Sequence, residues 1–176
     1  MTQLIILDRD GVINQDSYNY IKSVDEFIFI PGSIQAIVDL TAAGYTIAVA
    51  TNQSGVSRKL YSEQTLAAIH EKLVQTVEAA GGAIAVIESC IHLPEEHCSC
   101  RKPQPGMLLR IAERFQCSLT GVYFVGDRIS DIKVARAVGA SPIMIVSNMT
   151  NQSELTAYPE VPVYNSLADF VATLIK

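Results

Sequence analysis

The sequence lacks the features that would place the protein in a membrane or on a nucleic acid. No window of its 176 residues approaches 18 consecutive apolar residues, the length that a membrane-spanning helix needs. Positive charge is also scarce, because 13 Lys and Arg stand against 18 Asp and Glu and leave a net charge of −5. Nucleic-acid-binding surfaces are normally basic. We therefore expect neither a membrane span nor a nucleic-acid partner, whereas an anionic small molecule remains possible where basic residues gather.

A secretory context is lacking as well. The start, MTQLIILDRDG, has no basic region and reaches Asp8 after only four apolar residues, so we expect no signal peptide. The chain has four cysteines, at positions 90, 98, 100 and 117. Without a secretion signal they are expected to be thiols or metal ligands rather than disulfides. The sequence therefore predicts a cytoplasmic protein, which we expect to be a monomer.

Repeats, low-complexity tracts and linkers are also missing, so residues 1–176 are expected to form a single domain. Continuous apolar runs, typical of strands buried on both faces, alternate with helical patterns. The runs are LIIL (4–7), TIAVA (46–50), AIAVI (83–87), VYFV (122–125) and IMIV (143–146). Helices are expected to begin with caps at Ser33, Ser62 and Ser166 and with Pro105 in a first turn. This alternation predicts an α/β fold, a Rossmann-like parallel sheet with helices on both faces.

Polar side chains follow four of these runs. The segments are Asp8-Arg9-Asp10-Gly11, Thr51-Asn52-Gln53-Ser54-Gly55, the stretch from Cys90 to Pro103, and Gly126-Asp127 with Asp131 four residues later. Ligands of parallel sheets bind beyond the carboxyl ends of the strands, so we expect these segments to meet there. Each segment taken alone is also ordinary turn chemistry. The functional interpretation depends on the occurrence of all four together.

This set of side chains is suited to phosphoryl transfer. Carboxylates from Asp8, Asp10 and Asp127 are hard oxygen ligands of the kind that Mg²⁺ prefers. Lys102 supplies positive charge for a phosphate, and Thr51 with the neighbouring backbone amide is expected to hold phosphoryl oxygens. Phosphoryl transfer depends mainly on positioning and charge neutralisation, and an aspartate is available as the nucleophile.

The cysteine segment predicts a second metal site. Cys90-x-His92 and Cys98-x-Cys100 offer four ligands suited to tetrahedral Zn²⁺, although the spacing is tighter than in zinc fingers and unrelated buried thiols are the alternative. Because zinc would use all four ligands, its role is expected to be structural. The remaining residues of this kind are expected to lie outside the site: His97, Cys117 and His70, the last as a structural histidine on the long helix.

The segments LDRDGVIN, VATNQSG, Lys102 and VGDRISD resemble, in order, the four motifs of the haloacid dehalogenase superfamily of phosphatases. The resemblance implies that Asp8 is the nucleophile and forms an aspartyl-phosphate. It also implies that Asp10 is the general acid and base and gives its backbone carbonyl to Mg²⁺. Thr51 and Lys102 are then expected to hold the phosphoryl group. Asp127 would complete the metal site, with Asp131 supporting it indirectly.

Within the superfamily, the C-x-H…C-x-C-R-K-P pattern is similar to two groups, heptose 1,7-bisphosphate 7-phosphatases and histidinol-phosphatases. The segments TNQSGVSR and RKPQPGM favour the heptose group, which acts in synthesis of the nucleotide-activated heptose of the lipopolysaccharide core. This resemblance implies a phosphorylated sugar substrate, a minimal cap and a zinc-pinned loop. The expected substrate-binding residues are Asp16, Ser17, Tyr18, Asn19, Asn52, Gln53, Ser54 and Arg101, the last for the second phosphate and with Arg58 as a weaker candidate.

Two features keep alternatives open. The loop between His92 and Cys98 is short, as also occurs in histidinol-phosphatases, and Arg128 replaces a lysine found in some members. A phospho-receiver switch would also gather aspartates, a threonine and a lysine around Mg²⁺. Its acceptor aspartate should end the third strand, where this chain has Glu88-Ser89-Cys90.

Overall fold

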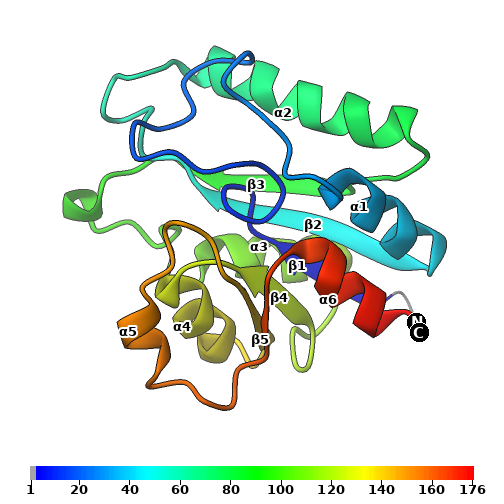
Figure 1. Ribbon diagram of the computed structural model, residues 1–176. Coiled ribbons are helices and arrows are strands. Elements are labelled where there is room, and N and C mark those ends of the chain that lie inside the picture. Colours follow the sequence, from blue (N-terminus) through cyan, green and yellow to red (C-terminus); the bar gives the residue numbers. More distant parts are fainter. Residues whose placement is uncertain (1–2) are drawn as a thin grey trace.

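The computed structural model describes residues 3–176, which form a layered α/β structure (Figure 1). Six strands build one sheet in the order β3-β2-β1-β4-β5-β6, and every neighbouring pair is parallel. The strands are β1 (Gln3–Leu7), β2 (Tyr45–Asn52), β3 (Val86–Cys90), β4 (Tyr123–Gly126), β5 (Ser141–Ile145) and β6 (Val163–Tyr164). The helices are α1 (Ser33–Ala42), α2 (Glu63–Ala79), the 3₁₀ turn η1 (Pro94–Glu96), α3 (Gly106–Phe115), α4 (Ile129–Ala137), α5 (Gln152–Leu155) and α6 (Leu167–Leu174).

Alternate side chains of the sheet face two separate helical layers. Ile5 and Leu7 of β1 pack in one core with residues of α1, α2 and α6. Leu4 and Ile6 point to the other face and pack with residues of α3 and α4. Full burial of such a side chain contributes roughly 1.5–3 kcal/mol relative to exposure, which explains why the central strand is apolar on both faces. The predicted Rossmann-like sheet with helices on both faces is confirmed (Figure 1).

Two of the four predicted helix starts are confirmed, and two are displaced by one residue. The hydroxyls of Ser62 and Ser166 accept hydrogen bonds from backbone amides in the first turns of α2 and α6. Ser33 is not a cap, because Gly32 occupies that position with a φ of 84° and the Ser33 hydroxyl donates to the Ile13 carbonyl over 2.7 Å. Pro105 immediately precedes α3 instead of lying in its first turn.

The third strand differs most from its prediction. The expected run was 83–87, whereas β3 spans Val86–Cys90 and its register pairs Cys90 with Asn52 of β2. β3 lies at the edge of the sheet and most of its side chains are only half-buried, so backbone pairing rather than apolar content sets its limits. The shift brings Cys90 level with the polar end of β2. Helix α4 corresponds to the helix that the turn interpretation of Gly126-Asp127 allowed, whereas α5 and β6 have no counterpart in the sequence prediction.

The loops after the strands lie together on one side of the molecule, at the left in Figure 1. Residues 8–32, between β1 and α1, contain no helix and only isolated β-bridges. This segment serves as the expected minimal cap. Within residues 3–176, every helix is too short or too polar to span a membrane.

Candidate active site

A cavity of about 550 Å³ opens at the carboxyl ends of β1, β2 and β4. It is lined by acidic, basic and amide side chains from segments that are far apart in sequence. Its lining includes Asp8, Asp10, Asp16, Ser17, Tyr18, Asn52, Gln53, Ser54, Arg58, Arg101, Lys102, Asp127, Arg128 and Asp131. The structure thus brings together the strand-end segments that the sequence singled out.

Asp8 and Lys102 form the centre of the site. Asp8 follows β1 directly, and its Oδ1 lies 3.1 Å from the Lys102 ammonium and accepts the Arg9 amide proton over 2.7 Å. Burial, together with the neighbouring carboxylates, raises the pKa of Asp8 well above its usual range, although Lys102 opposes this. Lys102 is also buried, and its ammonium donates to the Ala50 carbonyl and lies 2.8 Å from Asp131 Oδ1. Burial opposes its charge, but Asp131 and Asp8 raise the pKa of Lys102, so it stays protonated.

Asp127 directly follows β4, and its two carboxylate oxygens have different surroundings. Its Oδ2 accepts a 2.6 Å hydrogen bond from the Ser147 hydroxyl, whereas its Oδ1 is buried without a hydrogen-bond partner among residues 3–176. Burial and the nearby Asp131 raise the pKa of Asp127 to about 7. Carboxylate oxygens of Asp8, Asp127 and Asp131 lie within 4.8 Å of one another. An unpartnered buried oxygen in a carboxylate cluster is what a hard cation such as Mg²⁺ would satisfy.

Gly11 allows these two strand ends to approach. Its φ of 82° is a left-handed conformation, and a Cβ at this position would overlap the Asp127 carboxylate. Only glycine fits both the conformation and the space. The glycine that the sequence offered as ordinary turn chemistry is therefore required by the packing of the site.

Asp10 is held rigidly at the edge of the cavity. Its Oδ1 accepts from Arg9 Nη2 at 2.7 Å, Arg9 Nε at 2.9 Å and Asn14 Nδ2 at 2.8 Å, and its Oδ2 accepts from Gln53 Nε2 at 3.0 Å. Burial opposes the charge of this carboxylate, but Arg9 and the hydrogen bonds outweigh it and lower the pKa of Asp10. The fully buried Arg9 also contacts His70 Nε2. Burial and Arg9 lower the pKa of His70 to about 3, so the neutral ring accepts a hydrogen bond from the Arg9 guanidinium.

The polar end of β2 is largely occupied by internal hydrogen bonds. Thr51 is buried beneath the cavity rather than lining it, and its hydroxyl accepts from Gln53. The Asn52 side chain binds the backbone amide and carbonyl of Lys102 and so ties β2 to the lysine segment. The side-chain amide of Gln53 donates hydrogen bonds to Thr51 and Asp10 and accepts one from Tyr61. Ser54 lines the cavity and receives a weak 3.3 Å contact from Arg58.

The cap segment contributes three of its four expected residues to the cavity. Asp16, Ser17 and Tyr18 line it, whereas Asn19, which lies in the 17–20 turn, is not part of the lining. Asp16 pairs with Arg128 at 2.9 Å, and the Tyr18 hydroxyl donates to the Asn148 carbonyl. These two contacts connect the cap to the segments that follow β4 and β5.

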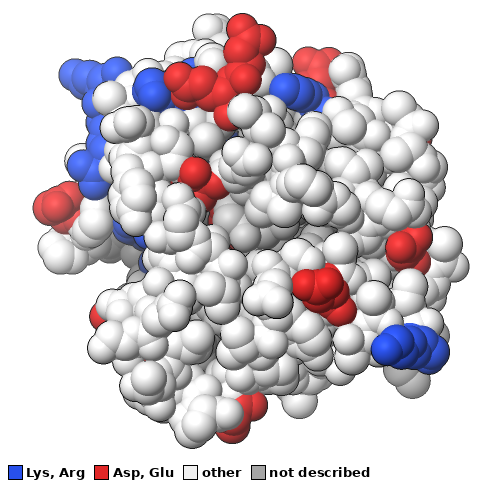
Figure 2. Space-filling view, viewed as in Figure 1, with Lys and Arg blue, Asp and Glu red and all other residues white. Residues whose placement is uncertain are grey.

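Basic side chains gather at the cavity although the protein is acidic overall. Arg58, Arg101, Lys102 and Arg128 all line it. Figure 2 shows blue side chains at the upper left, on the side where the loops follow the strands, with red side chains beside them. Five aspartates line the same cavity, so an anionic ligand is attracted only where basic side chains stand apart from these carboxylates or where a cation neutralises them.

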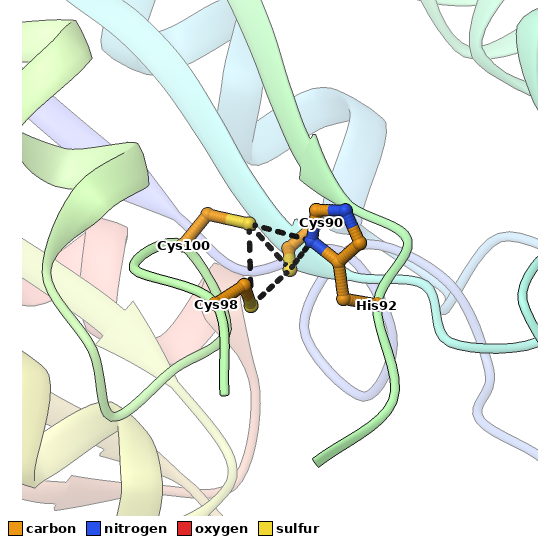
Figure 3. Close-up of side chains that lie close together, drawn as sticks. All are labelled: Cys90, His92, Cys98 and Cys100. Atoms are coloured by element: carbon orange, nitrogen blue, oxygen red, sulfur yellow. Dashed lines mark hydrogen bonds between the residues drawn. The ribbon is translucent and has the colours of Figure 1, made fainter. Parts of the chain in front are cut away.

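The cysteine segment converges on a second cluster beside the cavity. Cys90, His92, Cys98 and Cys100 point toward one another, with His92 Nδ1 facing the sulfurs (Figure 3). The Cys90–Cys98, Cys98–Cys100 and Cys90–His92 ligand atoms are each 3.6 Å apart. Tetrahedral zinc with bonds of about 2.3 Å to sulfur requires edges of roughly 3.8 Å. The Cys100 sulfur lies closer, 2.7 Å from Cys90 and 3.2 Å from His92, so an ion would move it outward.

Several residues of the site were missed by the sequence interpretation. The sequence assigns no role to Arg9, which lies between the two aspartates. In the structure Arg9 is fully buried and its guanidinium binds Asp10. Arg128 holds Asp16, and Ser147 holds Asp127, although Ser147 follows a strand in a segment with no recognised motif. The position of Ser147 at a strand end was the signal that could have identified it.

Comparisons with known proteins agree with this geometry. A family model described as HAD-hyrolase-like matches residues 99–170. Relatives from Pseudomonas putida and Pseudomonas aeruginosa are 48% and 45% identical, over 99% and 98% of this chain and 98% of each relative. Both are named D-glycero-beta-D-manno-heptose-1,7-bisphosphate 7-phosphatase.

A solved structure extends the agreement to three dimensions. The crystal structure of D,D-heptose 1.7-bisphosphate phosphatase from B. bronchiseptica, complexed with magnesium and phosphate, covers 98% of this chain and 97% of its own, with 43% identity and a TM-score of 0.91. These likenesses favour a phosphatase over the phospho-receiver alternative. The chain therefore belongs to the family of D-glycero-beta-D-manno-heptose-1,7-bisphosphate 7-phosphatases, within the haloacid dehalogenase-like hydrolases.

Proposed function

We propose that this protein removes the 7-phosphate of D-glycero-D-manno-heptose 1,7-bisphosphate through an aspartyl-phosphate, in the synthesis of nucleotide-activated heptose for the lipopolysaccharide core. The observation that carries the proposal is the contact of Asp8 with Lys102 beside the tightly held Asp10. A nucleophile, a positive charge and a proton carrier thus meet in one polar cavity. Relatives covering the whole chain carry the name of this enzyme, which supports the choice of substrate.

The residues divide the reaction into two displacements. Asp8 attacks phosphorus as the carboxylate, and its new O–P bond replaces the bond to the sugar oxygen. Asp10, which is ionised in the free protein, must first take up a proton from water, and it then gives that proton to the sugar oxygen. Asp10 then takes a proton from water as the water oxygen attacks phosphorus, which releases inorganic phosphate and restores Asp8. Lys102 neutralises and orients the phosphoryl oxygens during both steps, whereas the buried Thr51 lies beneath the cavity and holds Gln53.

Magnesium is assigned to the carboxylate cluster. Asp8, Asp127 and the backbone carbonyl of Asp10 would hold the ion, because Asp127 Oδ1 is buried and accepts no hydrogen bond from residues 3–176. Asp131 is bound to Lys102 and to the backbone amides of Asp127 and Arg128, so it supports the site indirectly. When bound, the ion would neutralise phosphoryl charge that two close carboxylates would otherwise repel.

The second phosphate of the substrate is assigned to Arg101. Its guanidinium lines the cavity and makes one long contact, 3.4 Å to the His92 carbonyl, which leaves other donors for a phosphate. Arg128 is already paired with Asp16, and Arg58 lies over the Tyr20 ring and is the weaker candidate. Asp16, Ser17 and Tyr18 would border the sugar. Guanidinium groups bind phosphate bidentately, so Arg101 is suited to a fixed remote anion.

Structural zinc is assigned to Cys90, His92, Cys98 and Cys100. The donor set and the 3.6 Å spacings support a closed tetrahedral site. Because the Arg101 amide lies 3.3 Å from the Cys98 sulfur, the cluster is directly continuous with the two basic residues that follow it. Zinc would therefore fix the backbone from which Arg101 and Lys102 reach the substrate. We further propose that the protein acts in the cytoplasm as a monomer.

The decisive experiment compares phosphate release from heptose 1,7-bisphosphate with release from histidinol phosphate, using purified protein and Mg²⁺. We expect higher kcat/KM for the heptose bisphosphate, with the 1-phosphate retained in the product. Faster hydrolysis of histidinol phosphate would move the assignment to the neighbouring group while leaving the roles of Asp8 and Asp10 intact. Absence of any phosphate release would overturn the proposal.

A further inference from the structure

The two carboxylate oxygens of Asp10 have unequal surroundings. Oδ1 accepts three hydrogen bonds, two from Arg9 and one from Asn14, whereas Oδ2 accepts one, from Gln53 Nε2. An oxygen that already accepts three donors has no free lone pair on which to hold a proton. Oδ2 is therefore the oxygen of Asp10 that can carry a proton and pass it on.

Gln53 is fixed in the one orientation that suits this oxygen. It is buried, and its Nε2 donates to Asp10 Oδ2 over 3.0 Å and to Thr51 Oγ1 over 2.9 Å. Its Oε1 accepts a 2.6 Å hydrogen bond from the Tyr61 hydroxyl. If the amide turned end for end, Gln53 Oε1 would face Asp10 Oδ2. It would repel the ionised carboxylate, and it would accept a hydrogen bond from the protonated carboxyl whose proton is needed by the leaving oxygen of the substrate. The hydroxyl of Tyr61 opposes that rotation.

Tyr61 is itself held by the turn that follows β2. Backbone hydrogen bonds from Val56 to the Gln53 carbonyl and from Leu60 to the Gly55 carbonyl fold residues 53–60 back on themselves. A Cβ at Gly55 would overlap the Tyr61 ring, so glycine makes the room in which the ring lies. Burial raises the pKa of Tyr61 to about 12, which keeps the hydroxyl proton available for Gln53.

We propose that Tyr61 and Gln53 form a positioning pair that reserves Oδ2 of Asp10 for proton transfer in both steps of the reaction. Neither residue needs to touch the substrate, since Gln53 acts through Asp10 and Tyr61 acts through Gln53. The inference deepens the proposed function, because it takes Asp10 to be the general acid and base of a phosphatase. It also changes the expected role of Gln53 from substrate binding to positioning.

The test is Tyr61→Phe, which keeps the ring and removes only the hydroxyl. A sugar phosphate needs a proton on its leaving oxygen, whereas p-nitrophenolate leaves as a stable anion. General acid–base catalysis contributes about 10²–10⁴-fold, and we expect loss of positioning to remove about 10–100-fold of it from kcat/KM for the sugar phosphate. For p-nitrophenyl phosphate, kcat/KM should change by less than about 3-fold. Its time course should gain a burst near one nitrophenol per chain, because water attack on the aspartyl-phosphate becomes slow.

Tyr123→Phe is the matched control, because it removes a tyrosine hydroxyl at the opposite end of β4 and should leave both substrates unaffected. Gln53→Met should reproduce the selectivity of Tyr61→Phe and replaces it if that variant fails to fold.

Equal losses on both esters, or no loss on the sugar phosphate, would overturn the positioning role. Wild-type protein that ignores the heptose bisphosphate would refute only the substrate assignment, and the comparison would then use another sugar phosphate that it hydrolyses. Protein that hydrolyses no phosphate ester would overturn both.

Discussion

Replacing Asp127 by Asn should stabilise the metal-free protein at alkaline pH while abolishing its use of Mg²⁺. The Asp127 carboxyl is fully buried and lies close to the Asp8 and Asp131 carboxylates, and its Oδ1 has no hydrogen-bond partner in the described part of the chain. An asparagine has nearly the same shape, its oxygen can still accept from Ser147, and its amide protons can face the other carboxylates. The substitution therefore removes a charge that only a cation would compensate.

The size and sign of this effect follow from the pKa of Asp127. Burial and Asp131 raise it from 3.8 to about 7, so the native protein keeps the proton over a range in which the unfolded chain has released it. The unfolded state binds fewer protons there, and stability falls as pH rises from about 4 to about 7. At about 1.4 kcal/mol per pKa unit, the wild type should lose roughly 2–3 kcal/mol relative to the variant between about pH 5 and pH 8.

Urea unfolding of both proteins without added Mg²⁺, at about pH 5 and about pH 8, measures this difference directly. Asp25→Asn, at an exposed position of the cap, is the matched control and should show no such pH-dependent gain. Adding Mg²⁺ at about pH 8 should raise the stability of the wild type and leave Asp127→Asn unchanged. A variant less stable than wild type at about pH 8 in the absence of Mg²⁺ would refute the reasoning. The interactions of the Asp127 carboxylate would then stabilise the fold by more than its buried charge destabilises it.

Three further substitutions test other parts of the site. Asp8→Asn should keep the fold and lower turnover by more than about 10³-fold, since an amide cannot form the acyl-phosphate; phosphate release within tenfold of wild type contradicts the assignment. Arg101→Ala should lower transition-state stabilisation, measured from the ratio of kcat/KM values, by on the order of 1.5–3 kcal/mol for the heptose bisphosphate and by much less for a simple monophosphate. Equal losses on both substrates would mean that Arg101 serves the reacting phosphate. Cys100→Ser should lower both the zinc content, from about one per chain by elemental analysis, and the unfolding temperature, whereas Cys117→Ser should change neither; a stable, zinc-free and active wild type would remove the zinc assignment.

The sequence by itself determined the class of fold and the edge at which the site lies. Continuous apolar runs at 4–7 and 46–50 could only be strands covered on both faces, and the helical patterns between them required parallel connections. Because parallel strands share one carboxyl edge, Asp8, Thr51 and Asp127 had to come together once the strands were recognised. Cys90 and His92, and likewise Cys98 and Cys100, are separated by one residue, and this close pairing predicted a cluster.

Contacts between distant segments could be decided only by the tertiary structure. Strand β3 begins at Val86 rather than residue 83, because pairing with β2 outweighs the local apolar run at a half-exposed edge. The sequence shows that Gln53 is polar and lies in a segment expected to bind phosphate. It does not show that Gln53 donates to Asp10 and accepts a hydrogen bond from Tyr61. Sequence periodicity reports which face of an element is buried, whereas a hydrogen bond depends on where a second segment places its partner atom. The polar end of β2 is therefore predictable as a binding edge, and its division between binding and positioning is a property of the folded chain.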